Sequence, residues 1–263
     1  MHTTSYKKME SFFKTYRDKF SRSEGKKARV LDVGSKAYEG QGTYRTLIDP
    51  NLYDYVGLDL ESGENVDLVP ATTYIWPELE DESFEICISG QTFEHNPFFW
   101  VTAAEMARVL VPGGYLCLIA PGGGPVHRYP MDCWRFYPDS WAALCALVGL
   151  ELVETYWEPD ALSVRLEDGG QWRDTMLIAR KPVLTGKARE EAIERRAQLI
   201  LPFQSGFGEF EAVSNRSGPA VNDYLATVER HTPRWPFENL RKRVAQKLYT
   251  RHVFEIYEPE AQD

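Results

Sequence analysis

The stretch ARVLDVGS, residues 28–35, decides the fold class. Its apolar residues form a short run, which is typical of a strand buried on both faces of a parallel sheet. The run ends at Gly34, a residue that lets the backbone turn sharply and leaves room for a ligand where a Cβ would intrude. We therefore expect the first strand of an α/β sheet here, with a ligand-binding turn at its carboxyl end.

Outward from this strand, similar short runs alternate with segments of helical periodicity. Strands are expected at residues 28–35, 53–61, 66–70, 83–90, 115–121, 151–159 and 172–182, and helices at 42–49, 100–110 and 140–150. This alternation favours an α/β fold with a doubly wound, mostly parallel, seven-stranded Rossmann-like sheet. Because the loop 160–171 is too short for a crossover helix, the last two strands should pair antiparallel, which gives one antiparallel edge strand.

The chain outside this α/β pattern is predicted to be helical. Aromatic residues recur at helical spacing over residues 5–20, a charged helix is expected over 186–203, and basic, aromatic helices are expected over 223–257. The predicted organisation has three parts: an N-terminal helical extension (1–27), a main domain (28–182) and a C-terminal helical extension (183–263).

Composition limits the location and the partners. The 263 residues carry a formal net charge of −9 and are 43% hydrophobic, as in ordinary soluble globular proteins. No long apolar run and no signal-peptide pattern are present, so we expect a cytoplasmic protein without stable membrane insertion. The acidic balance disfavours nucleic acid as a partner. The first 29 residues are basic, with nine Lys/Arg against three Asp/Glu, so a peripheral contact with an anionic surface stays open.

The cysteines and histidines predict neither a disulfide framework nor a metal site. The four cysteines, Cys87, Cys117, Cys133 and Cys145, form no C-x-x-C pair, and buried free thiols are expected. The five histidines are scattered, with no pair at metal-ligand spacing.

Acidic residues in and after the first two strands indicate the type of cofactor. Asp59 closes the second strand, where a carboxylate accepts hydrogen bonds from the hydroxyls of a ribose. A dinucleotide would need G-x-G-x-x-G after the first strand, but Gly34 is followed by Gly40 and Gly42, at the wrong spacing. Asp32 would also repel a pyrophosphate and could attract a cation. S-adenosylmethionine, with a ribose and two cationic groups but no phosphate, fits this turn, and a glycine-rich turn without any cofactor is the alternative.

The segments VLDVGS, VGLDL, SFEICISGQTFEH and RVLVPGGYLCLIAP resemble class I S-adenosylmethionine-dependent methyltransferases, especially the type 11 branch that acts on small molecules and glycans. The resemblance covers about residues 28–180 and implies S-adenosyl-L-methionine as the cofactor. Carried over to this sequence, the implied cofactor-binding residues are Asp32, Gly34, Ser35, Asp59, Leu60, Ser89 and Gly90. The loop DVGSKAYEGQG departs from the family, since it is longer than the usual three-glycine motif and contains Lys36 and Tyr38.

A second stretch, HRYPMDCWRFYPDSW at residues 127–141, follows the fifth strand and resembles a HRYPxDxWRF block of methyltransferases from glycan biosynthesis. Its position predicts a location over the carboxyl edge of the sheet. His127 and, after the fourth strand, His95 are candidate catalytic bases, because imidazole titrates near neutral pH. Candidate acceptor-binding residues are Arg128, Tyr129, Asp132, Trp134, Arg135 and Tyr137. The alternative for the charged residues is an internal ion pair of Asp132 with Arg135 or Arg128.

These features predict an enzyme that transfers the methyl group of S-adenosylmethionine to a hydroxyl of a small-molecule or glycan acceptor. A histidine would assist an in-line displacement. Nitrogen and carbon acceptors stay open. A catalytically inactive cofactor-binding scaffold or regulatory partner is the alternative of a different class, because a fold alone does not establish activity.

Overall fold

The structure, a computed structural model, describes residues 2–20, 26–38, 42–158, 169–204, 213 and 218–231. It divides into two compact units, Met1–Ala212 and Val213–Asp263. In the second unit the structure describes one helix, α5 (Pro219–His231), which overlaps the region predicted to be helical. The remainder of that predicted region, from residue 232 on, lies outside the described residues.

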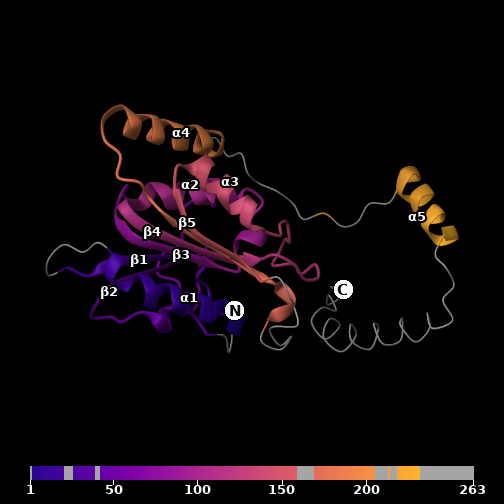
Figure 1. Cartoon of the computed structure of the whole chain (residues 1–263), viewed down its shortest axis with the longest axis horizontal. Coiled ribbons are helices and arrows are strands. Elements are labelled where there is room, and N and C mark those ends of the chain that lie inside the picture. Colours follow the sequence, from indigo (N-terminus) through magenta and orange to yellow (C-terminus); the bar gives the residue numbers. More distant parts are fainter. Residues whose placement is uncertain are drawn as a thin grey trace, which may run out of the picture. The chain divides into compact units, whose positions relative to one another are not determined.

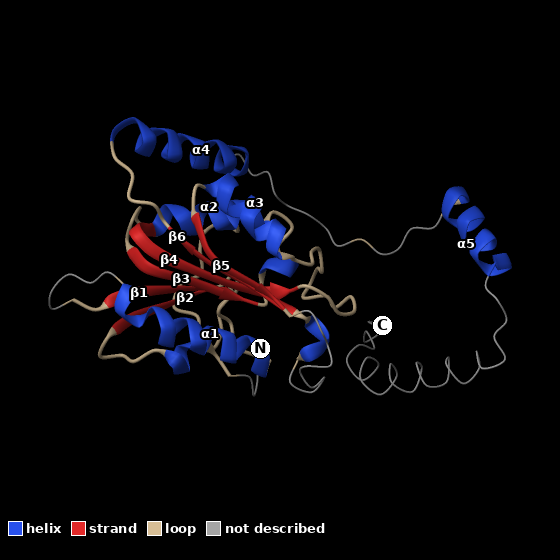
Figure 2. Ribbon diagram, viewed as in Figure 1, coloured by secondary structure: helices blue, strands red, loops and turns tan. Residues whose placement is uncertain are grey.

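The first unit is built on one sheet, which has six strands among the described residues (Figure 2). The strands are β1 (Ala28–Val33), β2 (Tyr53–Leu58), β3 (Phe84–Gly90), β4 (Leu110–Pro121), β5 (Glu151–Trp157) and β6 (Asp174–Arg180), in the order β2-β1-β3-β4-β6-β5. Strands β1 to β4 pair in parallel, whereas β6 pairs antiparallel with both β4 and β5. The mostly parallel sheet and the antiparallel pairing of the last two strands are confirmed. The antiparallel strand β6 lies one place in from the edge strand β5.

The prediction of seven strands is wrong for the described residues, because the segment 66–70 does not extend the sheet. Leu68 makes one isolated parallel bridge to the end of β2. The N–H groups of Asp67 and Leu68 both donate to the Gly57 carbonyl, at 2.7 and 3.0 Å. The Asp67 carboxylate accepts the Gly57 N–H at 2.8 Å. The segment therefore closes around the end of β2 instead of forming a ladder of its own.

The crossover from β1 to β2 also differs from the prediction. The helix expected over 42–49 is a short 3-10 turn, η2 (Tyr44–Leu47). Gly42 and Pro50 bracket this segment, and both residue types disfavour an α-helix. The sheet face beside this crossover is covered by α1 (Thr3–Tyr16), which Figure 1 shows on the side of the sheet opposite α2, α3 and α4.

Helix α1 is part of the hydrophobic core of the first unit. Its residues Met9, Phe12 and Phe13 share one buried cluster with Val30 of β1 and Ile86 of β3. Full burial of a side chain of this size stabilises a fold by about 1.5–3 kcal/mol. The N-terminal segment that looks like an extension in the sequence thus supplies the layer that covers one sheet face.

The other face of the sheet carries α2 (Phe99–Val109), α3 (Pro138–Val148) and α4 (Gly186–Gln204). Helix α3 ends at Gly149, whose φ of 77° provides a left-handed C-cap. Ile200 and Phe203 join α4 to the buried cluster beneath these helices. The carboxyl ends of the parallel strands are left to the connecting loops, where ligands bind in open α/β sheets.

The four cysteines are free thiols, as predicted, and three of them, Cys87, Cys117 and Cys145, are buried. In the part of the chain that the structure describes, no helix has both the length and the apolar character needed to cross a membrane.

Candidate active site

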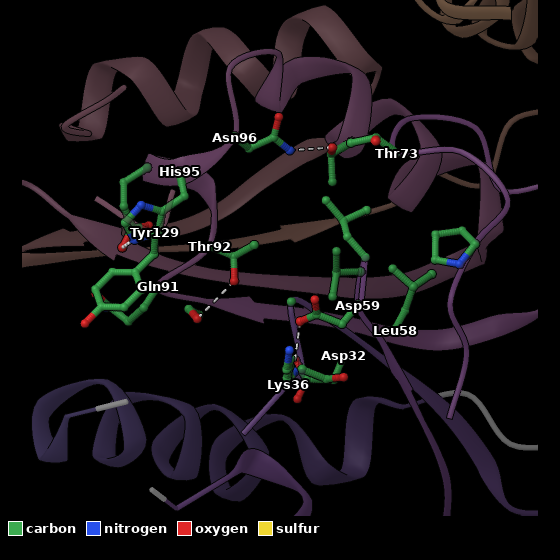
Figure 3. A pocket seen from close by; sticks show the side chains of 18 of the residues that line it. Asp32, Lys36, Leu58, Asp59, Thr73, Gln91, Thr92, His95, Asn96 and Tyr129 are labelled. Atoms are coloured by element: carbon green, nitrogen blue, oxygen red, sulfur yellow. Dashed lines mark hydrogen bonds and ion pairs between the residues drawn. The ribbon is translucent and has the colours of Figure 1, made fainter. Parts of the chain in front are cut away.

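A pocket of about 1480 Å³ opens at the carboxyl edge of the sheet (Figure 3). Its walls come from the loops after β1, β2, β3 and β4, from the 3-10 turn η5 (Gly170–Trp172) and from the end of α4. Figure 3 shows Asp32 and Asp59 on one side of the pocket and His95 and Tyr129 on the other. Since a single small ligand typically occupies about 300–1,000 Å³, this pocket has room for a cofactor and a second molecule.

The turn after β1 requires glycine. Gly34 has a φ of 78°, and an added Cβ would lie 2.1 Å from Thr92 Oγ1. The N–H groups of Gly34 and Ser35 both donate to the Leu58 carbonyl, at 2.8 and 3.1 Å, which ties the turn to the end of β2. The glycine turn, the end of β2 and the loop after β3 therefore converge at one wall of the pocket.

Asp59 follows β2 and lines this pocket together with Leu60, whose side chain is 54% exposed. Asp59 Oδ2 accepts the backbone N–H of Lys36 at 2.9 Å, whereas Oδ1 has only a longer contact of 3.5 Å with the N–H of Glu61. The Lys36 ammonium forms an ion pair with the Glu61 carboxylate at 2.6 Å. These contacts hold the loop after β1 against the loop after β2. Asp59 Oδ1 can still accept a hydrogen bond from a ligand.

Asp32, the penultimate residue of β1, is a buried carboxyl in the pocket wall. The Tyr55 hydroxyl donates to Asp32 Oδ2 at 2.5 Å. Burial raises the pKa of Asp32 to about 7, although the hydrogen bond from Tyr55 acts in the opposite direction. A cation bound nearby would therefore stabilise the charged form of this group.

The end of β3 contributes Gly90 to the pocket but not Ser89. Ser89 is buried, and its hydroxyl donates to the Val33 carbonyl at 2.7 Å. A Cβ on Gly90 would lie 2.0 Å from the Tyr44 hydroxyl oxygen. Of the residues implied by the resemblance, Ser89 has a bonding role inside the sheet, and the others, Asp32, Gly34, Ser35, Asp59, Leu60 and Gly90, line the pocket.

The two candidate bases, His95 and His127, come together although they are 32 positions apart in the sequence: their ring centroids lie 4.7 Å apart. Both residues line the pocket. His95 Nδ1 donates to the Met131 carbonyl at 2.5 Å. Burial lowers the pKa of both rings, and the pKa of His127 falls to about 4. Both imidazoles are therefore neutral at neutral pH.

Glu94, which was not among the predicted site residues, is the most unusual side chain of the site. It lies in the 3-10 turn η3 (Phe93–His95), is 0% exposed, and lines the pocket. Neither carboxylate oxygen has a hydrogen-bond partner among the described residues. Burial raises the pKa of Glu94 to about 8. Its position beside His95 after a buried strand is the signal in the sequence that could have identified it.

The ion pair proposed as the alternative for the second stretch is present. Arg135 donates to both oxygens of Asp132, at 2.5 and 2.8 Å, and to the Pro125 carbonyl at 2.7 Å. Asp132 Oδ2 also accepts the backbone N–H of His127 at 2.7 Å. Although burial opposes ionisation, these bonds lower the pKa of Asp132. Asp132 and Arg135 hold the loop that carries His127, and neither lines the pocket.

The remaining candidates of this stretch take different positions. Tyr129 lines the pocket, is 50% exposed, and its ring lies 6.0 Å from that of His95. Trp134 Nε1 donates to the Asn96 carbonyl at 3.0 Å. Tyr137 is the N-cap of α3. Arg128 is exposed, and like Trp134 and Tyr137 it lies outside the pocket wall.

Fold and pocket together define a class of protein: a doubly wound α/β protein with a ligand-sized pocket at the carboxyl edge of its sheet. Residues 31–118 match a family model described as a methyltransferase domain. An uncharacterised methyltransferase of Mycobacterium bovis (strain BCG / Pasteur 1173P2) is 31% identical over 110 residues, which are 36% of this chain and 42% of that protein. One of Mycobacteroides abscessus is 30% identical over 128 residues, 41% of this chain and 48% of that protein. The chain spans less than half the length of these curated relatives.

Among solved structures, the 1,6-didemethyltoxoflavin-N1-methyltransferase of Burkholderia thailandensis, with bound 1,6-didemethyltoxoflavin and S-adenosylhomocysteine, has the same fold. The TM-score is 0.50 at 16% identity, over 68% of this chain and 79% of that chain. Residues 31–118 of this chain are thus similar in sequence to methyltransferase domains, and the sheet has the fold of that solved methyltransferase.

Proposed function

We propose that this chain binds S-adenosylmethionine in the pocket and transfers its methyl group to a hydroxyl of a small molecule or glycan, with the assistance of histidine. One observation carries the proposal: the Asp59 carboxylate and the two imidazoles, His95 and His127, line the same pocket. This arrangement offers a ribose contact and a proton acceptor within reach of one bound cofactor and one acceptor molecule.

The pocket wall fits the parts of the cofactor. Asp59 Oδ1, with spare acceptor capacity, suits the ribose hydroxyls. The turn at Gly34, which packs closely against Thr92 and lines the same pocket, suits the methionine part. The segment Pro70–Thr73 lines the pocket near the end of β2 and offers backbone groups to the adenine ring. When bound, the cofactor supplies an electrophilic methyl carbon on a sulfonium.

The imidazoles are suited to handle the proton of the acceptor hydroxyl. Their neutral forms accept a proton, although a pKa of about 4 makes His127 a weak base. Met131 fixes the His95 ring, and Asp132 holds the backbone of His127. One of the two rings would take the hydroxyl proton as the oxygen bonds to the methyl carbon. A positioned base of this kind typically contributes about 10²–10⁴-fold to the rate.

Aromatic side chains at the rim support an acceptor with a ring. Tyr38 and Tyr129 are 51% and 50% exposed, and their ring centroids lie 6.0 Å apart. Trp172 lies 4.3 Å from His127, measured between ring centroids. Such faces stack on sugars and other flat or apolar rings, which favours a glycan or a ring-bearing small molecule.

Calorimetric titration with S-adenosylhomocysteine tests the cofactor site. We expect a dissociation constant in the micromolar range, about −8 kcal/mol, for the native chain, and at least tenfold weaker binding for Asp59→Ala. Asp54→Ala is the matched control, because Asp54 lies on β2, the strand that Asp59 follows, but is exposed outside the pocket. No binding to the native chain would exclude a cofactor site, and binding without turnover on any hydroxyl acceptor would favour the scaffold alternative.

A further inference from the structure

Three side chains at the histidine end of the pocket bring metal-ligand atoms together. A carboxylate oxygen of Glu94 and ring nitrogens of His95 and His127 all lie within 4.8 Å of one another. Glu94 Oε1 is 3.6 Å from His95 Nε2. Two ligands at 2.0–2.1 Å from a tetrahedral ion are about 3.3–3.4 Å apart, so a cation fits here after small side-chain movements.

The Glu94 carboxyl has no hydrogen-bond partner in the part of the chain that the structure describes, and His95 Nε2, 3.6 Å away, is in a neutral ring. The carboxyl is also fully buried. Leaving a buried polar group unpaired costs about 1–3 kcal/mol, and more for a charged group. A bound cation would satisfy both oxygens, and this need points to a ligand independently of the cluster itself.

An oxygen lies behind each imidazole, where metal-binding histidines usually have a hydrogen-bond acceptor. His95 donates its Nδ1–H to the Met131 carbonyl at 2.5 Å, which leaves Nε2 as the ligand atom facing Glu94. His127 Nδ1 lies 3.4 Å from Asp132 Oδ2, a carboxylate held by Arg135, but makes no hydrogen bond to it in the described structure, so a small ring rotation is needed to form one. A carbonyl or a carboxylate behind the ring fixes the orientation of a ligating histidine.

We propose that Glu94, His95 and His127 bind one divalent transition-metal ion such as Zn²⁺, with an open coordination position that faces the pocket. Two imidazoles and one carboxylate suit Zn²⁺ and its neighbours in the first transition row, and a site with three protein ligands keeps a position for water or substrate. Sequence spacing does not indicate this set, because two of its residues are adjacent and the third comes from a loop 32 positions further along the chain.

The role of the ion rests on the proposed function. The oxygen of the acceptor hydroxyl coordinates at the open position, and the ion lowers the pKa of that hydroxyl so that its proton passes to solvent. The oxygen then bonds to the methyl carbon while the carbon–sulfur bond breaks and its electron pair stays on sulfur. In this case the two histidines would assist the reaction as ligands of the ion, and not by accepting the hydroxyl proton themselves.

Cobalt titration of the full, chelator-treated chain tests the site without any acceptor. We expect one Co²⁺ per chain, with visible d–d absorption bands that disappear when Zn²⁺ displaces it. Loss of an outer-shell partner typically weakens metal binding by about 10–100-fold, so Glu94→Gln and His127→Gln should weaken it at least as much. His2→Gln is the matched control, because His2 lines the same pocket outside the ligand set.

Melting temperatures keep the test independent of misfolding. Zn²⁺ should raise the melting temperature of the native chain but not of Glu94→Gln, which should fold about as stably as the metal-free native chain because an uncharged amide of nearly the same shape replaces the carboxyl. The proposal is overturned by the absence of Co²⁺ bands or by bands that persist in both ligand variants. S-adenosylhomocysteine titration of the metal-free chain separates this failure from failure of the proposed function.

Discussion

Asp32 and Glu94 are two buried carboxyls in the wall of one pocket, and their surroundings differ. Asp32 accepts a hydrogen bond from Tyr55, whereas Glu94 has no such partner in the described part of the chain. Burial raises the pKa of Asp32 to about 7 and that of Glu94 to about 8. The negative charge of each group therefore becomes favourable when a positive ligand binds, and we propose the cationic cofactor as that ligand at Asp32 and a metal ion at Glu94.

The raised pKa of Asp32 predicts a pH-dependent effect of Asp32→Asn on stability. Because the folded-state value of about 7 lies above the usual 3.8, the unfolded chain ionises first and native stability falls as pH rises between these values. The loss is about 1.4 kcal/mol per pH unit and levels off above the folded-state pKa. Urea unfolding without ligand should be measured at about pH 5 and about pH 8. The free energy of unfolding of Asp32→Asn, relative to that of the native chain, should be higher at pH 8 than at pH 5. An equal difference at both pH values would contradict the predicted shift.

At the scale of elements, the parallel strands were predictable because each is a short apolar run with a turn residue after it. The pattern failed where hydrogen bonding, not hydrophobicity, decides the conformation: Asp67 and Leu68 share one acceptor, so the segment 66–70 is no strand. It failed again in the crossover after β1, where a helix-like pattern between Gly42 and Pro50 is only a 3-10 turn. Periodicity also could not tell that α1 covers the sheet, because coverage depends on contacts between distant segments.

The coverage by α1 predicts a large effect of Phe12→Ala. Phe12 is 1% exposed and lies against Phe13, Tyr16 and Phe20. Removing a buried phenyl ring leaves a cavity and costs about 3–5 kcal/mol. Urea denaturation followed by circular dichroism should show this loss in Phe12→Ala and almost no change in Lys14→Ala, whose side chain on the same helix is exposed. Equal, small effects in both variants would mean that α1 is not part of the folding core.

At the scale of the whole molecule, the candidate site is assembled from segments that are far apart in the sequence. Strand ends are positioned by topology, so Asp59 and Gly34 could be placed at the carboxyl edge of the sheet from the sequence, and both line the pocket there. Glu94 and Ser89 could not be assigned in this way, because a side chain beside a strand end can face the pocket or the sheet. The sequence also could not decide whether the charged side chains of residues 127–141 bind an acceptor or pair with each other. In the structure, Asp132 and Arg135 form a bidentate ion pair.

The division of the chain predicts that residues beyond Ala212 are dispensable for the cofactor site. Every described residue that lines the pocket lies between His2 and Gln204, and the first compact unit ends at Ala212. A chain that ends at Ala212 should therefore unfold at nearly the same urea concentration as the full chain and bind S-adenosylhomocysteine with an affinity within about twofold of that of the full chain.

The matched control is a chain that ends at Pro182. It lacks α4 and with it Phe203, which packs against Tyr74 at 5.0 Å between ring centroids. Losing a buried Phe typically costs about 3–5 kcal/mol, so this chain should be clearly less stable. Loss of binding in the longer truncation would show instead that the second unit completes the site.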